Sequence, residues 1–414
     1  MDLKRKIATG IATGALLANA LMPMAFATES GTNLTISGNG SGSDNLVEVE
    51  LENETTVNQT NNATFNNSIN GDASTGGNDA NDNTGGDVEI DTGDADVTAT
   101  VNNSANQNWA SVDCCVSNDV EVKISGNGSD SDNTVKLKAE DDDNKIKIDQ
   151  YNNAYFNNNV NADAKTGYND ANDNTGGDVE IDTGNASVTV SVSNWANANS
   201  ARVGDGGNGG SLSLWILDNG SDSRNLIDVE LENEVDVDQD NHATFDNDIY
   251  ADAKTGKNDA NDNTGGNVEI DTGDATVDVT VDNMANFNWA DLNCGCLLDD
   301  LTAKIAGNGS DSDNTIDVEL ESDQEVDQDN RASFDNDVDA DAKTGKNDAE
   351  DNTGENGGDP SIDTGDADVT VEAFNDANLN GVGGDEPEWP ELNFGGLSIS
   401  LSFDLGDLLD ALGF

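Results

Sequence analysis

Loops rich in Asp, Asn and Gly recur along the chain, and their composition suits the binding of a hard cation. Residues 127–133 (NGSDSDN) and 169–178 (NDANDNTGGD) place Asp and Asn at alternate or nearly alternate positions around glycine. Calcium takes about six to eight oxygen ligands from carboxylates, carbonyls and water, so these loops are candidate Ca²⁺ sites. The candidate metal ligands are Asp130, Asp132, Asp170, Asp173, Asp178, Asp222, Asp259, Asp262, Asp311 and Asp313.

Ordinary turn formation is the alternative interpretation of these loops. Asx-turns and glycines with positive φ require the same residue types. Neither segment has the full EF-hand pattern with its terminal Glu, and neither matches the glycine-rich nonapeptide of calcium-binding β-rolls. Both interpretations therefore stay open.

Four cysteines are the next candidates for chemistry, and they occupy equivalent connectors of two repeats. Cysteines of an exported chain form disulfides by default. A bridge between adjacent residues would be strained, so we expect cross-pairing within the chain or between molecules. The spacing does not suit a four-cysteine zinc site. The disulfide candidates are Cys114, Cys115, Cys294 and Cys296.

The sequence contains no recognisable catalytic set. His242 is the only histidine, and its counterparts in the other repeats are Asn62, Asn153 and Arg331. A G-x-S-x-G elbow and a phosphate-binding loop are also missing. We therefore predict that the protein is not an enzyme and that it has no catalytic residues.

The first 27 residues have the features of a signal peptide. Lys4, Arg5 and Lys6 precede an apolar segment, which ends in the small-residue cleavage sequence Ala25-Phe26-Ala27. No later segment has the 18 or more apolar residues that a membrane-spanning helix needs. We expect a secreted protein at the extracellular cell surface, without a transmembrane helix once the signal peptide is removed.

The charge of the chain excludes one class of partner. It has 84 acidic and 17 basic residues, for a net charge of −67. Binding of nucleic acid needs Lys and Arg against phosphate, so we predict no nucleic-acid partner. Salt or bound cations must screen such a charge before the chain compacts. Either a high-salt habitat or Ca²⁺ explains the excess of Asp.

Internal repetition determines the predicted architecture. The central glutamines Gln59, Gln150, Gln239 and Gln328 are separated by 91, 89 and 89 residues. A period of this length indicates one supersecondary unit used four times. The expected parts are the signal peptide 1–27, repeats 28–119, 120–210, 211–300 and 301–384, and a linker with a C-terminal cap or assembly strand at 385–414.

Each repeat contains a long run of alternating residues. In residues 235–256 (VDVDQDNHATFDNDIYADAKTG), apolar and amide side chains alternate with side chains that are mostly carboxylates. A period of two predicts a β-strand with one inner and one outer face. The Asp face could bind cations, or it could serve only as a solvated face that blocks edge aggregation. On one face of the last strand of the third repeat we expect Ala275, Val277, Val279, Val281, Asn283, Ala285, Phe287 and Trp289.

The inward amides favour one fold over another. Gln239, Asn241 and Asn247 share the face of Val and Phe, and a buried amide is costly unless it is hydrogen-bonded. Identical amides in stacked copies form hydrogen-bonded ladders. We therefore predict an all-β, β-solenoid-like stack of four units. A string of β-sandwich modules is the alternative.

The C-terminal segment 397–405 (LSISLSFDL) is a further alternating strand. It could cap its own stack, add to the open edge of another subunit, or anchor the protein at the surface. The residues of this assembly strand are Leu397, Ile399, Leu401, Phe403 and Leu405.

The motifs GNGSDSDN, NDANDNTGGDVEIDTGDA and V-x-N-x-A-N resemble the Asn/Asp/Thr-rich tandem repeats of predicted surface proteins in small-genome candidate-phylum bacteria. The resemblance covers nearly all of residues 33–380, and it implies a surface location rather than a particular activity. A looser similarity to curlin-type repeats rests on Gln59, Asn61 and Ala63.

Three classes of function fit these observations. We expect a structural protein of the cell surface, namely a fibre, stalk or surface-layer component, that is stabilised by Ca²⁺ and self-assembles. The alternatives are an adhesin in which the repeats are a spacer, and a calcium- or mineral-binding matrix protein. The expected partners are further copies of the chain or other cell-surface components.

Overall fold

The structure is a computed structural model. It describes residues 6–13, 18–20, 32–51, 53–112, 119–139, 144–204, 211–293, 300–354, 359–384, 392–394 and 397–399. All regular secondary structure in these residues is β, which confirms the all-β prediction.

Four parallel sheets run through the repeats, and each repeat contributes to all of them. The entry sheet contains β3 (Thr32–Ser37), β8 (Val120–Ser125), β13 (Ser211–Leu217) and β17 (Asp300–Ala306). The long sheet contains β4 (Asp44–Glu50), β5 (Asn53–Ser74), β9 (Asp132–Ala139), β10 (Asn144–Lys165), β14 (Arg224–Lys254) and β18 (Asp313–Lys343).

The chain then turns back through two further sheets. The end sheet contains β6 (Val88–Thr92), β11 (Val179–Thr183), β15 (Val268–Thr272) and β19 (Ser361–Thr364). The return sheet contains β7 (Ala95–Val112), β12 (Ala186–Val203), β16 (Ala275–Leu292) and β20 (Ala367–Val382), with β1 (Lys6–Thr13) and β2 (Ala18–Ala20) pairing with β7. A separate antiparallel pair joins β21 (Leu392–Phe394) to β22 (Leu397–Ile399).

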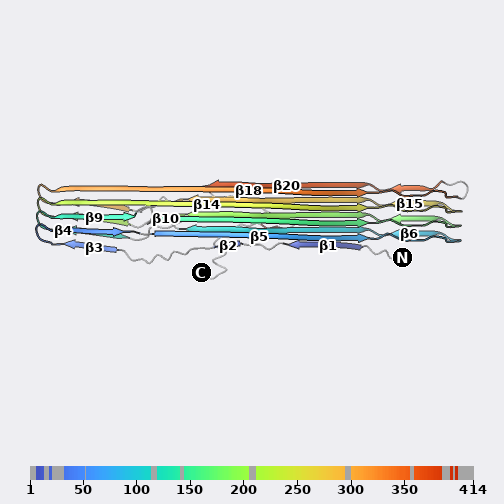
Figure 1. The fold of residues 1–414 in the computed structure, drawn as a ribbon, viewed down its shortest axis with the longest axis horizontal. Helices are drawn as coiled ribbons and strands as arrows, with labels where there is room; N and C mark the ends of the chain where they lie inside the picture. The colour runs from blue at the N-terminus through green and yellow to red at the C-terminus, as the bar shows by residue number, and fades with distance from the viewer. Residues whose placement is uncertain are drawn as a thin grey trace.

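Equivalent residues of successive repeats are paired in parallel. Gln150 is paired with Gln59 on one side and with Gln239 on the other, and Gln239 is paired in turn with Gln328. Figure 1 shows the strands lying side by side along the long axis, with the chain colour changing from blue to red across them. Because strands in a parallel sheet lie only about 4.8 Å apart, side chains of equivalent positions form columns.

The long alternating run is a single extended strand. Along β14 the residues alternate between buried and more exposed, as the sequence predicts, and Val235, Val237 and Phe245 are on the buried face. The strand has 31 residues, and at about 3.3 Å per residue it extends for about 100 Å. The length is possible because every residue of β14 pairs with β18 on one side.

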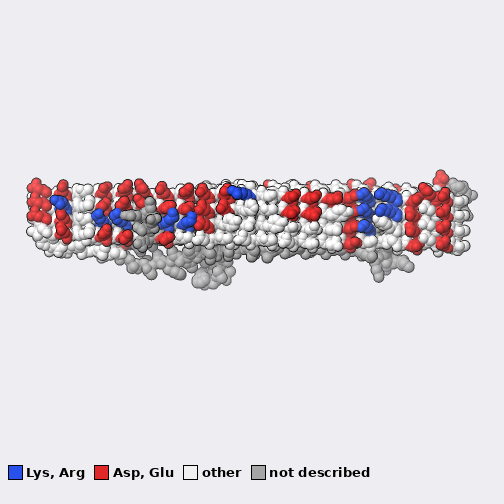
Figure 2. Space-filling model, in the orientation of Figure 1, with Lys and Arg blue, Asp and Glu red and all other residues white. Residues whose placement is uncertain are grey.

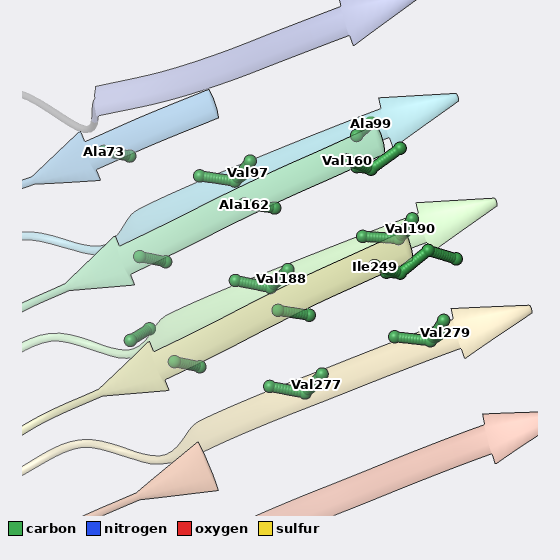
Figure 3. Close-up of a cluster of buried hydrophobic side chains, with 14 of the residues drawn as sticks. Ala73, Val97, Ala99, Val160, Ala162, Val188, Val190, Ile249, Val277 and Val279 are labelled. Atoms are coloured by element: carbon green, nitrogen blue, oxygen red, sulfur yellow. The ribbon is translucent and has the colours of Figure 1, made fainter. Parts of the chain in front are cut away.

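The core lies between the long sheet and the entry and return sheets, and the end sheet packs on the loop that precedes it. Figure 3 shows one part, in which Ala99 and Val190 of the return sheet lie near Val160 and Ile249 of the long sheet, respectively. A second cluster, which includes Leu214 and Ile227, joins the entry sheet to the start of the long sheet, and a third joins the end sheet to its loop. Burial of each such side chain contributes about 1.5–3 kcal/mol.

A one-residue bulge that β7, β12, β16 and β20 share at the same position, so that their register is unchanged, corrects one prediction. The pairing of β12 with β16 passes from Ala196–Ala285 directly to Ala198–Phe287, so Asn197 and Asn286 are left out of the ladder. Beyond the bulge the inward positions change parity, and Asn288 and Ala290 face the core. The prediction that Phe287 and Trp289 share the face of Val277 is therefore wrong: both lie on the opposite face of the return sheet, where they are nevertheless buried, and the Arg202 guanidinium is 5.4 Å from the Trp289 ring.

Several predicted residues lie outside the described part of the chain. They are Cys114, Cys115, Cys294, Cys296, Leu401, Phe403 and Leu405. Leu397 and Ile399 belong to β22. The described residues include no helix that is long and apolar enough to cross a membrane.

Candidate functional site: amide columns, acidic columns and an open edge

A column of glutamines connects the four repeats inside the protein. Gln150 Nε2 donates to Gln59 Oε1, Gln239 Nε2 to Gln150 Oε1, and Gln328 Nε2 to Gln239 Oε1, each at 2.7 Å. The second N–H of each amide reaches the return sheet: Gln239 Nε2 also donates to the carbonyl oxygen of Trp289 at 3.0 Å. The column therefore binds neighbouring repeats to each other and the two faces of each repeat together.

Columns of asparagine run parallel to the glutamines. Asn103 donates to Asn194, Asn194 to Asn283, and Asn283 to Asn375, each at 2.7 Å. A second column joins Asn61, Asn152, Asn241 and Asn330 at 3.0–3.1 Å. In both columns the Nδ2 group donates toward the fourth repeat, so these columns have a direction.

The bulge forms a third asparagine column. Asn106, Asn197, Asn286 and Asn378 all have φ near +65°, a region that Asn tolerates better than most residues. Asn197 Nδ2 donates to Asn286 Oδ1 at 3.0 Å and to the carbonyl oxygen of His242 at 2.7 Å. Its side chain thus fixes the bulge against the long sheet. His242 contributes only its backbone to this contact.

Acidic side chains form columns on the outer face of the long sheet. Figure 2 shows them as stripes of Asp and Glu across the strands, interrupted by stripes of Lys and Arg. A hollow of about 650 Å³ crosses repeats two to four in this region. Burial raises the pKa of Asp240, and the carboxylates of Asp329 and Asp238 raise it further. The hollow is lined by Asp149, Gln150, Tyr151, Asp238, Gln239, Asp240, Asp327, Gln328 and Asp329.

Lysines of the second repeat neutralise part of this acidic face. Lys147 Nζ lies 3.0 Å from Asp149 Oδ1 and 3.3 Å from both Asp236 Oδ2 and Asp238 Oδ2. The hydrogen bond to Asp149 is the largest cause of the raised pKa of Lys147, and the bonds to Asp236 and Asp238 add to it. Cations and carboxylates therefore alternate between repeats two and three at this point.

The predicted calcium ligands occupy turns rather than a shared site. Asp130, Asp222 and Asp311 have φ near +58°, which is the conformation of a turn residue. Asp132 lies 3.6 Å from the guanidinium of Arg224. Asp313 begins β18. No group of three or more potential metal ligands comes together in the part of the chain that the structure describes.

The remaining candidates lie in the loop before the end sheet. Asp173 and Asp262 also have positive φ. Asp170 and Asp259 are bridged to each other, and burial raises the pKa of Asp259, with the neighbouring carboxylates of Asp170 and Asp348 as further causes. Asp178 Oδ1 accepts the backbone N–H of Asn267 at 2.8 Å. The equivalent carboxylates of successive repeats therefore form columns, and they do not converge on a common cation position.

The fourth repeat leaves an open edge. Among the residues that the structure describes, β17, β18, β19 and β20 each have a pairing partner on one side only. The side chain positions that are buried in the third repeat are exposed here: Leu320 is 51% exposed and its counterpart Leu231 only 3%. Val371 is 46% exposed, against 0% for Val279. We define the open edge as these four strands.

The sequence reasoning missed the bulge, and it anticipated an open edge without identifying the strands that form it. The bulge has a visible signal, because Asn194 and Asn197 are three residues apart, which interrupts an alternating pattern, and the same spacing occurs in Asn283 and Asn286. The open edge has no local signal. The last repeat keeps the strand pattern of the others, and its position in the stack leaves its outer edge without a described partner strand.

Comparison of the chain with family models, with curated proteins and with solved structures gave no match.

Proposed function

We propose that this protein is a secreted structural component of the cell surface, a fibre, stalk or surface-layer protein, and that its repeats form a four-unit β-solenoid. The pairing of equivalent residues across the four repeats is the observation that supports the proposal. Each repeat uses its inner side chains for contacts to its neighbours, as the Gln59–Gln150–Gln239–Gln328 column illustrates. In such a protein the number of repeats determines the length of the structure, and the outward side chains determine its surface.

The outer faces are consistent with this role. They carry carboxylates in repeated columns, and the hollow that crosses repeats two to four is lined by aspartates and glutamines, with one tyrosine. A high density of negative charge keeps a rod solvated and prevents lateral aggregation. Export depends on the signal peptide at residues 1–27, which remains a prediction from the sequence.

Immunogold labelling of intact source cells tests the surface location. We expect gold on the outside of the cell and the first residue of the extracted protein at Thr28. Labelling only inside permeabilised cells, or an N-terminus at Met1, would contradict the proposal. A cytoplasmic protein of the same cells provides the control for leakage.

Divalent cations are a second part of the proposal, and the columns of like charge favour it. The pKa values of Asp240 and Asp259 are raised by burial and by carboxylates of the adjacent repeats. A cation such as Ca²⁺ would neutralise these columns, so we propose that the protein is stabilised by cations distributed over its acidic faces. The turn aspartates do not form a closed site, and we assign no individual ligand set.

Thermal unfolding with and without Ca²⁺ tests this part. At constant ionic strength, Ca²⁺ should raise the melting temperature more than Na⁺ does, and chelation should reverse the increase. Equal melting temperatures in the two salts would leave only general screening and contradict a specific role of divalent cations.

A further inference from the structure

The open edge of the fourth repeat exposes groups that the inner repeats use to bind each other. Leu320 and Val371 occupy core positions, yet about half of each side chain is exposed. The backbone N–H and C=O groups along the outer side of β18 and β20 have no neighbouring strand in the described part of the chain. A long unpaired edge of this kind is a template for another strand.

The asparagine columns show which strand the edge accepts. Asn286 donates to Asn378, and Asn283 donates to Asn375, but the Nδ2 groups of Asn375 and Asn378 have no acceptor among the described residues. At the other end of the column that contains Asn286 and Asn378, the Oδ1 atom of Asn106 is buried and accepts no hydrogen bond from a described residue. A column that ends in an unused donor at one end and an unused acceptor at the other can be continued by another copy in the same orientation.

The charges in the middle of the long strands favour the same orientation, whereas at their start Glu48, Glu50 and Glu54 of a first repeat would lie beside Asp317, Glu319 and Asp323. The outward positions Asp327, Asp335 and Asp337 of the fourth repeat correspond to Asn58, Asn66 and Ser68 in the first. A first repeat placed on the fourth would therefore set neutral amides and a hydroxyl beside the aspartates. The chain already contains such a contact, because Asn159 Nδ2 donates to Asp248 Oδ2 at 3.2 Å.

From these observations we infer that the open edge binds the first repeat of a second copy, in parallel and in register, and that repetition of this contact gives a head-to-tail filament. Two fourth repeats facing each other would bring aspartates against aspartates and Asn donors against Asn donors. A heterologous contact of this kind does not close on itself, so it extends without limit. The inference rests on the proposed structural function and names the partner of its open edge.

The N-terminal segment covers part of the edge of the first repeat that the fourth repeat of another copy would bind. In the full chain β1 pairs in parallel with β7, with Lys6 opposite Ala95 and Thr13 opposite Asn102. This is the edge of the first repeat that the incoming fourth repeat would use. Cleavage after Ala27, which the sequence predicts, would remove β1 and β2 and open that edge.

Sedimentation velocity and negative-stain electron microscopy test the inference on the chain from Thr28 to Phe414 and on the full chain 1–414. Above a critical concentration we expect the shorter chain to form unbranched filaments one molecule wide, and the full chain to remain in short species. A shorter chain that stays monomeric at all concentrations, or that stops at dimers, would overturn the inference.

Two substitutions of neighbouring residues in β20 provide a matched pair. Val371→Lys places a charge at an exposed core position of the open edge, where the next copy would bury it, and should raise the critical concentration at least about tenfold. Thr370→Lys adds the same charge to the outer face and should leave the critical concentration nearly unchanged. Equal effects of the two would contradict the contact.

Further measurements separate the possible failures. Asn378→Asp replaces the unused donor with an acceptor that would face Asn106 Oδ1, and should weaken assembly with little change in circular dichroism. If surface labelling succeeds but none of these chains forms filaments, the head-to-tail contact is wrong and the proposed function stands. If filaments form in vitro but labelling finds the protein inside cells, the proposed function is wrong.

Discussion

Gln239 donates a hydrogen bond to Gln150 at 2.7 Å, although the two residues are 89 positions apart in the chain. Both side chains are buried, and each glutamine also donates to a backbone carbonyl of the return sheet. A buried amide without a hydrogen-bond partner costs stability. The two glutamines bond to each other because the repeat places the same residue at the paired position of the next strand. The stability of the protein depends on such columns as much as on its apolar contacts.

Substitution of an inner column residue should be costly. Asn194→Ala removes the acceptor of Asn103 and leaves buried donors unsatisfied, so we expect it to lower the free energy of unfolding by about 2–4 kcal/mol. The control is Asn375→Ala, in the same column at the open edge: it also removes an acceptor, that of Asn283, but at an exposed position whose own Nδ2 group has no acceptor among the described residues. Chemical denaturation should show a markedly smaller effect for the control; equal losses would contradict the role of the column.

The bulge should distinguish glycine from alanine. Asn197 has φ of 65°. Asn197→Ala loses the hydrogen bonds of the side chain, and alanine tolerates this left-handed backbone conformation less well than asparagine does. Asn197→Gly loses the same bonds without that strain, so it should be less destabilising by roughly 1 kcal/mol. At Asn199, two residues along in the regular strand, we expect the opposite order, because glycine weakens an extended strand. The same order at both positions would argue against the bulge.

Lys147 should stabilise the protein in a salt-dependent way. Lys147→Gln leaves Asp149, Asp236 and Asp238 without their shared cation, and at low salt we expect a loss of about 0.5–1 kcal/mol. The loss should nearly vanish at high salt because these partly exposed charges are screened. Lys123→Gln provides the control, since Lys123 has no ion pair with a described residue. An effect independent of salt would point to packing instead.

Mild acidification should stabilise the protein. Burial raises the pKa of Asp282, and the carboxylate of Asp376 adds to the shift. Because the folded protein then binds a proton more readily than the unfolded chain, ionisation of Asp282 costs stability at neutral pH. That stability is regained as the pH falls through the raised pKa toward the ordinary value of 3.8. Asp182, Asp240 and Asp259 have the same direction of shift.

Melting curves at low salt between about pH 7 and pH 4.5 test this sign. The melting temperature should rise as the pH falls over this interval. Asp282→Asn should raise the stability at pH 7 by about 0.2–1 kcal/mol and reduce the pH dependence, since it removes one carboxylate from a pair of like charges. A steady decrease of the melting temperature over the same interval would contradict the assignment.

The candidate metal loops show where sequence reasoning is ambiguous. Asp130 and Asp173 were candidate ligands because Asp, Asn and Gly are also the residues of calcium loops. Both have positive φ in the structure and belong to turns. The same residue types serve the two purposes, because a short polar side chain both tolerates this backbone conformation and ligates cations. Only the positions of the neighbouring side chains distinguish them.

The sequence by itself determined the all-β class, the alternating faces of the long strands and the identity of the buried amides. Each follows from local rules, because a strand exposes alternate residues to opposite sides and a repeated residue meets its equivalent. The tertiary structure decided what depends on position along the whole chain. A single extra residue at Asn286 turns Phe287 and Trp289 to the opposite face of the return sheet. The fourth repeat exposes Leu320 and Val371 because no described strand pairs with its outer edge, although its strand pattern resembles that of its neighbours.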